Sequence, residues 1–91
     1  MFAIFLVDEK ANELVLKTAR QMASIAPRRR IALSEGLTGA AASSKEPVLV
    51  GDVRLDPRYI AVEDDVRSEL VMPLVHKGKV VGVFDLESRE L

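Results

Sequence analysis

Hydrophobic and polar positions alternate along much of this chain with the period of β-strands. Residues 2–9 (FAIFLVDE) are apolar at successive positions, as in a central strand covered on both faces, and residues 13–20 (ELVLKTAR) alternate more loosely after a polar turn. Two further apolar runs within residues 68–88 flank Gly78, which can supply the positive φ of a tight turn. The pattern predicts two hairpins, with Pro73 at an edge or bulge because it lacks the N–H that a strand ladder needs.

Between the hairpins the pattern changes. Residues 28–35 (RRRIALSE) predict a third strand with Ile31 and Leu33 on one face. Thr38 stands where a helix cap is expected, before the small residues of GAAASSK, and Pro47 closes that short helix. The sequence therefore places one short helix after the third strand.

The next segment, residues 47–50 (PVLV), predicts a short strand, and residues 51–63 predict an ordered loop with turns at a Gly-Asp and an Asp-Pro pair. The strands are joined locally rather than by helical crossovers. The expected fold class is therefore α+β with an antiparallel sheet.

Composition narrows the class of protein. Of the residues, 48% are hydrophobic and 30% are charged, as in a folded globular domain. The net charge is −1 with 13 basic and 14 acidic residues interspersed, which argues against a nucleic-acid partner. The arginines at 28–30 are the exception, and both a solvated edge and a contact with an acidic partner are open. The apolar runs are too short to cross a bilayer and no signal sequence precedes Phe2, so we expect a cytoplasmic protein without a membrane partner.

Catalytic and metal chemistry find little support in the residue types. The chain has no cysteine, which removes thiolate nucleophiles and thiolate metal sites. His76 is the single histidine and falls beside the turn HKGK, where its ring is expected to face water. Glu63, Asp64 and Asp65 are expected to form a solvated loop face in preference to a metal or general-acid cluster. We therefore predict no catalytic residue, no metal site and no enzyme.

The joint order of several short motifs resembles the GAF domain family of small-molecule sensor modules. The motifs are EGLTG at 35–39, PVLVGDV at 47–53, DPRY at 56–59, SELVMPL at 68–74 and GVFDLES at 82–88. The nearest group within the family is the GAF domain of bacterial PP2C-type serine phosphatases of stress and sigma-factor regulation. The resemblance implies an antiparallel sheet of about six strands, with a short helix and a long lid loop on one face. It also implies a single domain over residues 1–91 that lacks the usual flanking helices.

In such a fold the helix and the lid enclose a cavity against the sheet. The resemblance places six candidate ligand-binding residues there: Leu33, Asp52, Tyr59, Ser68, Glu69 and Met72. Each has a purely structural alternative. Asp52 and Asp56 can close turns of their own backbone, Tyr59 can pack into the lid, and Glu69 can accept hydrogen bonds that orient the fold.

Specialised members of the family need residues that this chain lacks. Bilin-binding members and members that reduce methionine sulfoxide use cysteines, cyclic-nucleotide binders carry an Asn-Lys pair, and haem binders need an inward histidine. No cofactor is therefore expected, and the ligand is an unknown small molecule.

The resemblance implies a non-catalytic sensor that regulates an output domain, such as a phosphatase or kinase, in bacterial signal transduction. The alternative is a dimerisation or protein-interaction module whose pocket is filled by Leu33, Leu37 and Met72. Without flanking helices, one face of the strands would expose apolar side chains. We therefore expect a homo-oligomer, weakened by Glu at Phe5 or Val83.

Overall fold

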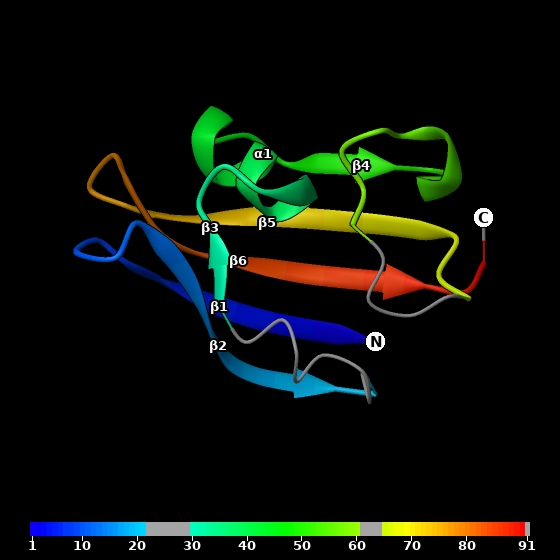
Figure 1. The fold of residues 1–91 in the computed structure, drawn as a ribbon, viewed down its shortest axis with the longest axis horizontal. Coiled ribbons are helices and arrows are strands. Elements are labelled where there is room, and N and C mark those ends of the chain that lie inside the picture. Colours follow the sequence, from blue (N-terminus) through cyan, green and yellow to red (C-terminus); the bar gives the residue numbers. More distant parts are fainter. Residues whose placement is uncertain (22–29, 61–64, 91) are drawn as a thin grey trace.

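The computed structural model describes residues 1–21, 30–60 and 65–90, which form a six-stranded antiparallel sheet with a helix over one face (Figure 1). The elements in chain order are β1 (Phe2–Asp8), β2 (Glu13–Arg20), β3 (Arg30–Ala32), α1 (Gly36–Ser44), β4 (Val48–Val50), the 3-10 helix η2 (Val53–Leu55), β5 (Ser68–His76) and β6 (Lys79–Ser88). The strand order across the sheet is β3-β2-β1-β6-β5-β4. The predicted antiparallel α+β fold is confirmed, and the first two residues of the predicted third strand lie outside the described residues.

The two predicted hairpins form the centre of the sheet. Lys77 and Gly78, between β5 and β6, both have positive φ, which is the backbone of a two-residue turn that matches the twist of the strands. Pro73 lies in an interior strand, but β4 pairs only with residues 69–71 of β5, so no strand lies beside Pro73 on that side. A register shift follows at once between Leu74 and Val75. The missing N–H of the proline is therefore tolerated at the point where pairing becomes irregular.

Helix α1 begins earlier than predicted, and Thr38 is not its cap. The residue before the helix is Glu35, which makes no side-chain capping bond, and Gly36 takes the turn into the helix with φ of +67°. Thr38 sits within the first turn and its hydroxyl donates to the Glu35 carbonyl oxygen at 3.3 Å. At Gly39 a Cβ would lie 2.6 Å from the carbonyl carbon of Ser34, so the helix passes directly against the chain that leads into it.

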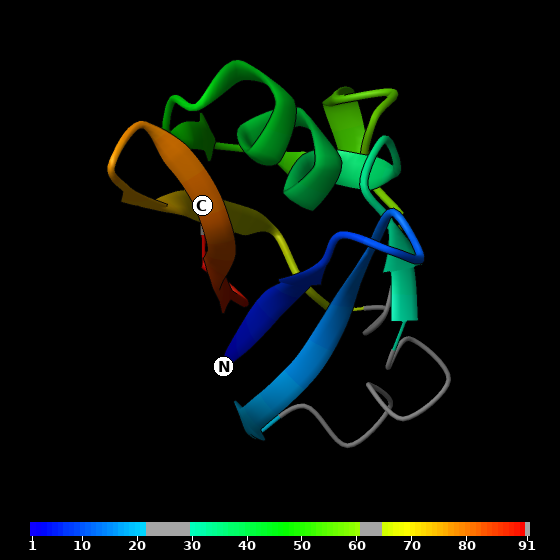
Figure 2. The same ribbon diagram turned by 90° about the vertical axis from the view of Figure 1, so that its left-hand side faces the viewer.

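The core lies between α1 and the sheet face that it covers (Figure 2). Phe5 and Val83 pair at the centre of this inner face, and their exposed fractions are 1% and 0%. The prediction that these two residues lie at an oligomer interface is therefore wrong. Both faces of FAIFLV are apolar, so the sequence could not tell which set points inward, and the structure turns Leu6 outward at 40% exposure. No helix of the described residues is long and apolar enough to span a membrane.

Candidate functional site

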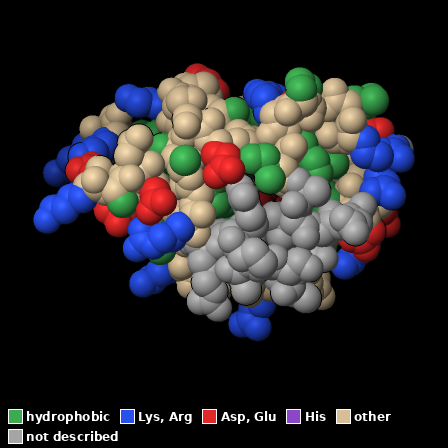
Figure 3. Space-filling model, in the orientation of Figure 1, with side chains coloured by type: hydrophobic (Ala, Val, Ile, Leu, Met, Phe, Trp, Pro, Cys, Tyr) green, Lys and Arg blue, Asp and Glu red, His purple; other side chains and the backbone are tan. Residues whose placement is uncertain are grey.

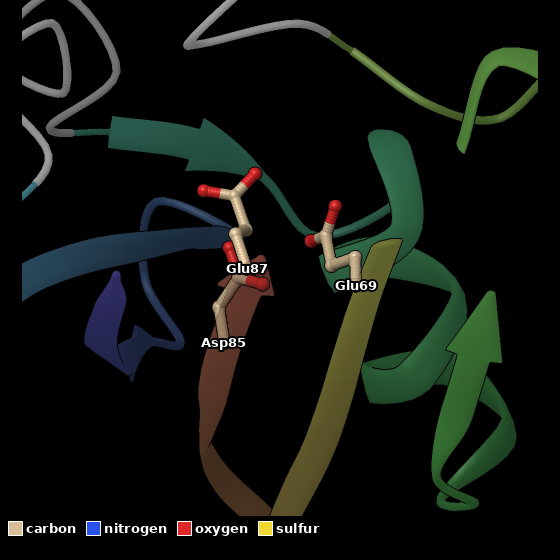
Figure 4. Close-up of side chains that lie close together, drawn as sticks. All are labelled: Glu69, Asp85 and Glu87. Carbon is tan, nitrogen blue, oxygen red and sulfur yellow. The ribbon is translucent and has the colours of Figure 1, made fainter. Parts of the chain in front are cut away.

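Three acidic side chains converge on the inner face of the sheet, where a hydrophobic core would ordinarily continue. Glu69 comes from β5, and Asp85 and Glu87 come from β6 (Figure 4). Their exposed fractions are 5%, 5% and 3%. One carboxylate oxygen from each residue lies within 4.8 Å of those from the other two. Buried acids this close together are costly unless a proton or a cation joins them, so we treat this carboxylate cluster as the candidate site.

The pairing of two strands builds the cluster. Along β6, residues 83, 85 and 87 share the inner face because side chains alternate, and Val83 at the start of this row belongs to the core. Glu69 pairs directly with Glu87, while its strand neighbour Val71 pairs with Asp85. Glu69 therefore faces one acid directly and the other diagonally, and both lie within reach of a carboxylate.

Burial and mutual hydrogen bonding set the electrostatics of the cluster. Loss of hydration raises the pKa of Glu69, and its hydrogen bond with Asp85 and the charges of Asp85, Glu87 and Asp56 raise it further. Burial also raises the pKa of Asp85, while the hydrogen bond with Glu69 opposes that shift. The second oxygen of Asp85, Oδ1, is buried and has no hydrogen-bond partner among the described residues. The cluster therefore favours a bound proton or a bound cation over three free negative charges.

A small cavity of about 30 Å³ opens beside the cluster, and all three acids line it. The remaining lining residues are Phe5, Ile31, Glu35, Gly36, Leu37, Thr38, Tyr59 and Ile60. This volume matches about one water molecule. Neither lysine nor arginine appears among the described lining residues, so the cavity suits a compact positive group and disfavours an anion. The same three oxygens could hold a hard metal ion, which likewise prefers carboxylate ligands.

A wider, open hollow of about 590 Å³ adjoins the small cavity. Gly36 and Ile60 line both spaces. The other walls of the hollow are Asn12, Leu33, Ser34, Ala40, Ser43, Pro57 and Arg58. A ligand with a cationic head in the small cavity could therefore extend the rest of the molecule into the hollow. On the face drawn in Figure 3, basic side chains lie around the edge of the molecule, with acidic ones among them.

Of the six predicted ligand-binding residues, the structure places three at these spaces. Tyr59 and Glu69 line the small cavity, and Leu33 lines the open hollow. Leu33 therefore does not fill the small cavity, although Leu37 contributes to its wall. Ligand binding by these three residues stays a prediction.

The other three predicted residues lie away from the cavity. Asp52 accepts hydrogen bonds from the backbone N–H of Arg54 at 3.1 Å and from its guanidinium at 2.9 Å. Asp52 therefore closes a turn of its own backbone, which the sequence analysis gave as the alternative to ligand binding. The Ser68 hydroxyl donates to the carbonyl oxygen of Glu90. Met72 is 39% exposed and points away from α1. The structure thus does not bring these residues together with Glu69.

Sequence reasoning missed Asp85, Glu87 and Glu35 as members of the site. A signal was present in VFDLES, because side chains alternate along a strand and Asp85 and Glu87 therefore point to the same face as the buried Val83. An acid on the buried face of a strand indicates a functional site, since charged residues are rarely buried without a partner. His76 is exposed at the end of β5, as predicted. Two of the three acids of the predicted loop run, at 63 and 64, lie outside the described residues.

The comparison with known proteins settles the family. A family model described as GAF domain matches residues 1–91. This chain belongs to the GAF domain family. The solved GAF domain of a phosphoenolpyruvate-protein phosphotransferase from Coxiella burnetii matches with a TM-score of 0.88 and 26% identity, over 98% of this chain and 56% of that one. The predicted family is confirmed, and the narrower likeness to PP2C-linked GAF domains stays a prediction.

Two relatives of this GAF domain are named as enzymes. Free methionine-R-sulfoxide reductase of Saccharomyces cerevisiae is 40% identical over 58 residues, which are 63% of this chain and 32% of that protein. Free methionine-R-sulfoxide reductase of Neisseria meningitidis, solved in complex with its substrate, has a TM-score of 0.85 and 34% identity, over 99% of this chain and 53% of that one. This GAF domain thus spans between 32% and 53% of the length of these two relatives.

These relatives contradict the prediction that the chain is not an enzyme, because both carry the name of a reductase. That prediction relied on the missing cysteine and on the exposed position of His76. It took no account of Asp85 and Glu87, which come beside Glu69 only when β5 and β6 pair. The coarse conclusion, a GAF fold, stands.

Proposed function

We propose that this GAF domain binds a small molecule through a protonated amine held by the carboxylate cluster. The observation that carries the proposal is the convergence of three buried carboxyl groups on a cavity of about 30 Å³. An ammonium group has three N–H donors and a positive charge, and each carboxylate can accept one donor. The cavity is large enough for such a head group, while the adjoining hollow gives room for the rest of the ligand.

The relatives suggest a first candidate for the ligand. The Neisseria protein that shares this fold at 34% identity was solved with its substrate, and its name identifies free methionine-R-sulfoxide. A free amino acid carries the protonated amine that the cluster requires, and its carboxylate would lie outside the small cavity, in the hollow that Arg58 also lines. We therefore propose free methionine-R-sulfoxide, or an amino acid of similar size, as the ligand of this chain.

In this proposal the domain serves as a small-molecule sensor or regulatory module of bacterial signal transduction. A ligand that binds one conformation more tightly than another shifts the population toward it, and an attached output domain such as a phosphatase or kinase can respond to that shift. Two parts of the cavity wall lie outside the sheet, the start of α1 and the lid segment around Tyr59, and the residues of the lid segment that line the cavity belong to no helix or strand. We therefore expect ligand binding in the cavity to shift the conformation of this lid segment.

Titration calorimetry with methionine-R-sulfoxide tests the proposal. We expect saturable binding, and we expect Nα-acetyl methionine-R-sulfoxide to fail, since acetylation removes the positive charge but keeps the side chain. Asp85→Asn should abolish binding, whereas Asp65→Asn, at an exposed position paired with Arg89, should not affect it. Equal binding of the acetylated compound would sink the proposal. An assay with a thiol reductant on the same sample asks whether reduction follows binding.

A second candidate function is a dimerisation module, and the outer face of the sheet favours it. Leu6, Met72 and Leu86 are each about 40% exposed there, and Phe2 stacks on Phe84 with ring centroids 5.6 Å apart. Pairing of two such faces in a homodimer would remove this apolar surface from water. This function and amine binding use opposite faces and do not compete.

A further inference from the structure

We propose that Ile60 determines the specificity of the site, because its side chain restricts the small cavity to a primary ammonium group and excludes N-methylated amines. The inference rests on the proposed function, since it concerns the same cavity and an amine-bearing ligand. It adds the substrate class: the nitrogen that enters the cavity carries a single carbon, the one that joins it to the rest of the ligand.

The small cavity and the open hollow meet at a junction that we call the neck. Among the described residues that line these two spaces, Gly36 and Ile60 are the two that line both. The Cδ1 and Cγ1 atoms of Ile60 lie 3.4 and 3.7 Å from the position that a Cβ would take at Gly36. The side chain of Ile60 thus covers the bare backbone of Gly36 at about van der Waals distance. A ligand that occupies both spaces must pass between these two residues, and Ile60 supplies the side chain that sets the width.

The remaining walls of the small cavity leave little room for a larger head group. The cavity of about 30 Å³ matches one water molecule. An ammonium group has a single heavy atom, as water has, whereas an N-methyl substituent adds a second one. Phe5 and Leu37 are 1% and 3% exposed and belong to the hydrophobic core, which is close-packed and does not expand without cost. Ile60 is 36% exposed, so we expect an added methyl group to lie in the neck and to meet its side chain.

N-methylation changes two properties of an amine, and the two effects can be separated. It adds the volume of one carbon, and it removes one of the three N–H donors while the positive charge remains. A difference of one carbon in a shaped pocket is worth roughly 10–200-fold in discrimination. Loss of a donor weakens binding whatever residue stands at position 60. A selectivity that changes when Ile60 is shortened therefore reports the width of the neck and not the number of donors.

Titration calorimetry with methionine-R-sulfoxide and with its Nα-methyl derivative tests the inference. We expect the wild-type chain to bind the methylated compound at least about tenfold more weakly. Ile60→Val removes Cδ1, the atom nearest to Gly36, and should reduce this selectivity in part. Ile60→Ala should reduce it by about tenfold, mainly through tighter binding of the methylated compound. Leu55→Ala is the matched control, because Leu55 is 81% exposed and lines neither space, and its selectivity should equal that of the wild type.

The outcomes separate this inference from the proposed function. Equal binding of the two compounds by the wild-type chain, or the same selectivity in the wild type, Ile60→Val and Ile60→Ala, would overturn the inference and leave amine binding standing. No binding of methionine-R-sulfoxide by the wild type would sink the proposed function and the inference with it. Thermal melts accompany each titration, and Ile60→Val keeps the test decisive if the larger truncation lowers the melting temperature.

Discussion

The two faces of the β5–β6 hairpin invert the usual distribution of residues. On the inner face Glu69, Asp85 and Glu87 are buried, whereas on the outer face Met72 and Leu86 are 39% and 41% exposed. Both sets lie on the same two strands and alternate with one another. Burying acids lowers the stability of the fold, and apolar residues left in water do not contribute the stability that their burial would give. We therefore attribute the inner acids to the proposed ligand binding, and the outer apolar residues to the proposed association.

The largest effect should come from extending the acidic row into the core. Val83 is fully buried on the inner face beside Phe5, and Val83→Glu would place a charge there without a cavity or a partner. We expect a loss of at least about 3 kcal/mol in the free energy of unfolding, measured by denaturant titration. The matched change on the outer face, Leu86→Glu, should alter the unfolding free energy of the monomer by about 0.5 kcal/mol. Similar losses for the two variants would contradict the assignment of faces.

The second effect tests the helix that closes the inner face. Gly39→Val would place side-chain atoms against the Leu33 carbonyl oxygen and the Ser34 backbone, which lie 2.8 and 2.6 Å from the position of a Cβ. We expect a loss of roughly 2–3 kcal/mol from overpacking, read as a lower melting temperature. Gly51→Ala is the control, because nothing lies within 4 Å of its Cβ position. An unchanged melting temperature in Gly39→Val would show that the approach can relax without cost.

The carboxylate cluster should also make stability depend on pH. The pKa values of Glu69 and Asp85 are raised in the folded state, so the folded chain binds more protons than the unfolded chain above their ordinary values of 4.5 and 3.8. The free energy of unfolding should therefore fall as pH rises from about 5 toward 9. Asp85→Asn should flatten this profile and raise stability by about 1–2 kcal/mol at the alkaline end. A wild-type profile that rises over this range would refute the pKa directions.

The smallest effect concerns the outer face. If two outer faces pair, light scattering should give a mass above that of the 10.0 kDa monomer at high concentration, and Leu86→Glu should shift it toward the monomer. The expected weakening of association is roughly tenfold, corresponding to about 1.4 kcal/mol. A monomeric wild-type chain at every concentration would remove the second candidate function.

The sequence predicted the hairpins and the strand types because the period-2 pattern and the turn residues are local signals. It misplaced the start of α1, since Thr38 is a common cap residue and the positive φ at Gly36 decides the geometry instead. It also could not choose the inner face of β1, whose two faces are both apolar. The carboxylate cluster escaped prediction because it depends on the register between β5 and β6, which brings Glu69 opposite Glu87 across a gap of eighteen positions. Of the three acids in the cluster, the sequence analysis named only Glu69, which lies in the motif SELVMPL.

The central claim is that the carboxylate cluster holds the amine of a small ligand. A crystal structure of this chain with methionine-R-sulfoxide tests it most directly. The account predicts the amine nitrogen about 3 Å from carboxylate oxygens of Glu69 and Asp85, with the sulfoxide in the hollow beside Ile60. A ligand bound elsewhere, or one whose amine points away from the cluster toward solvent, would contradict it.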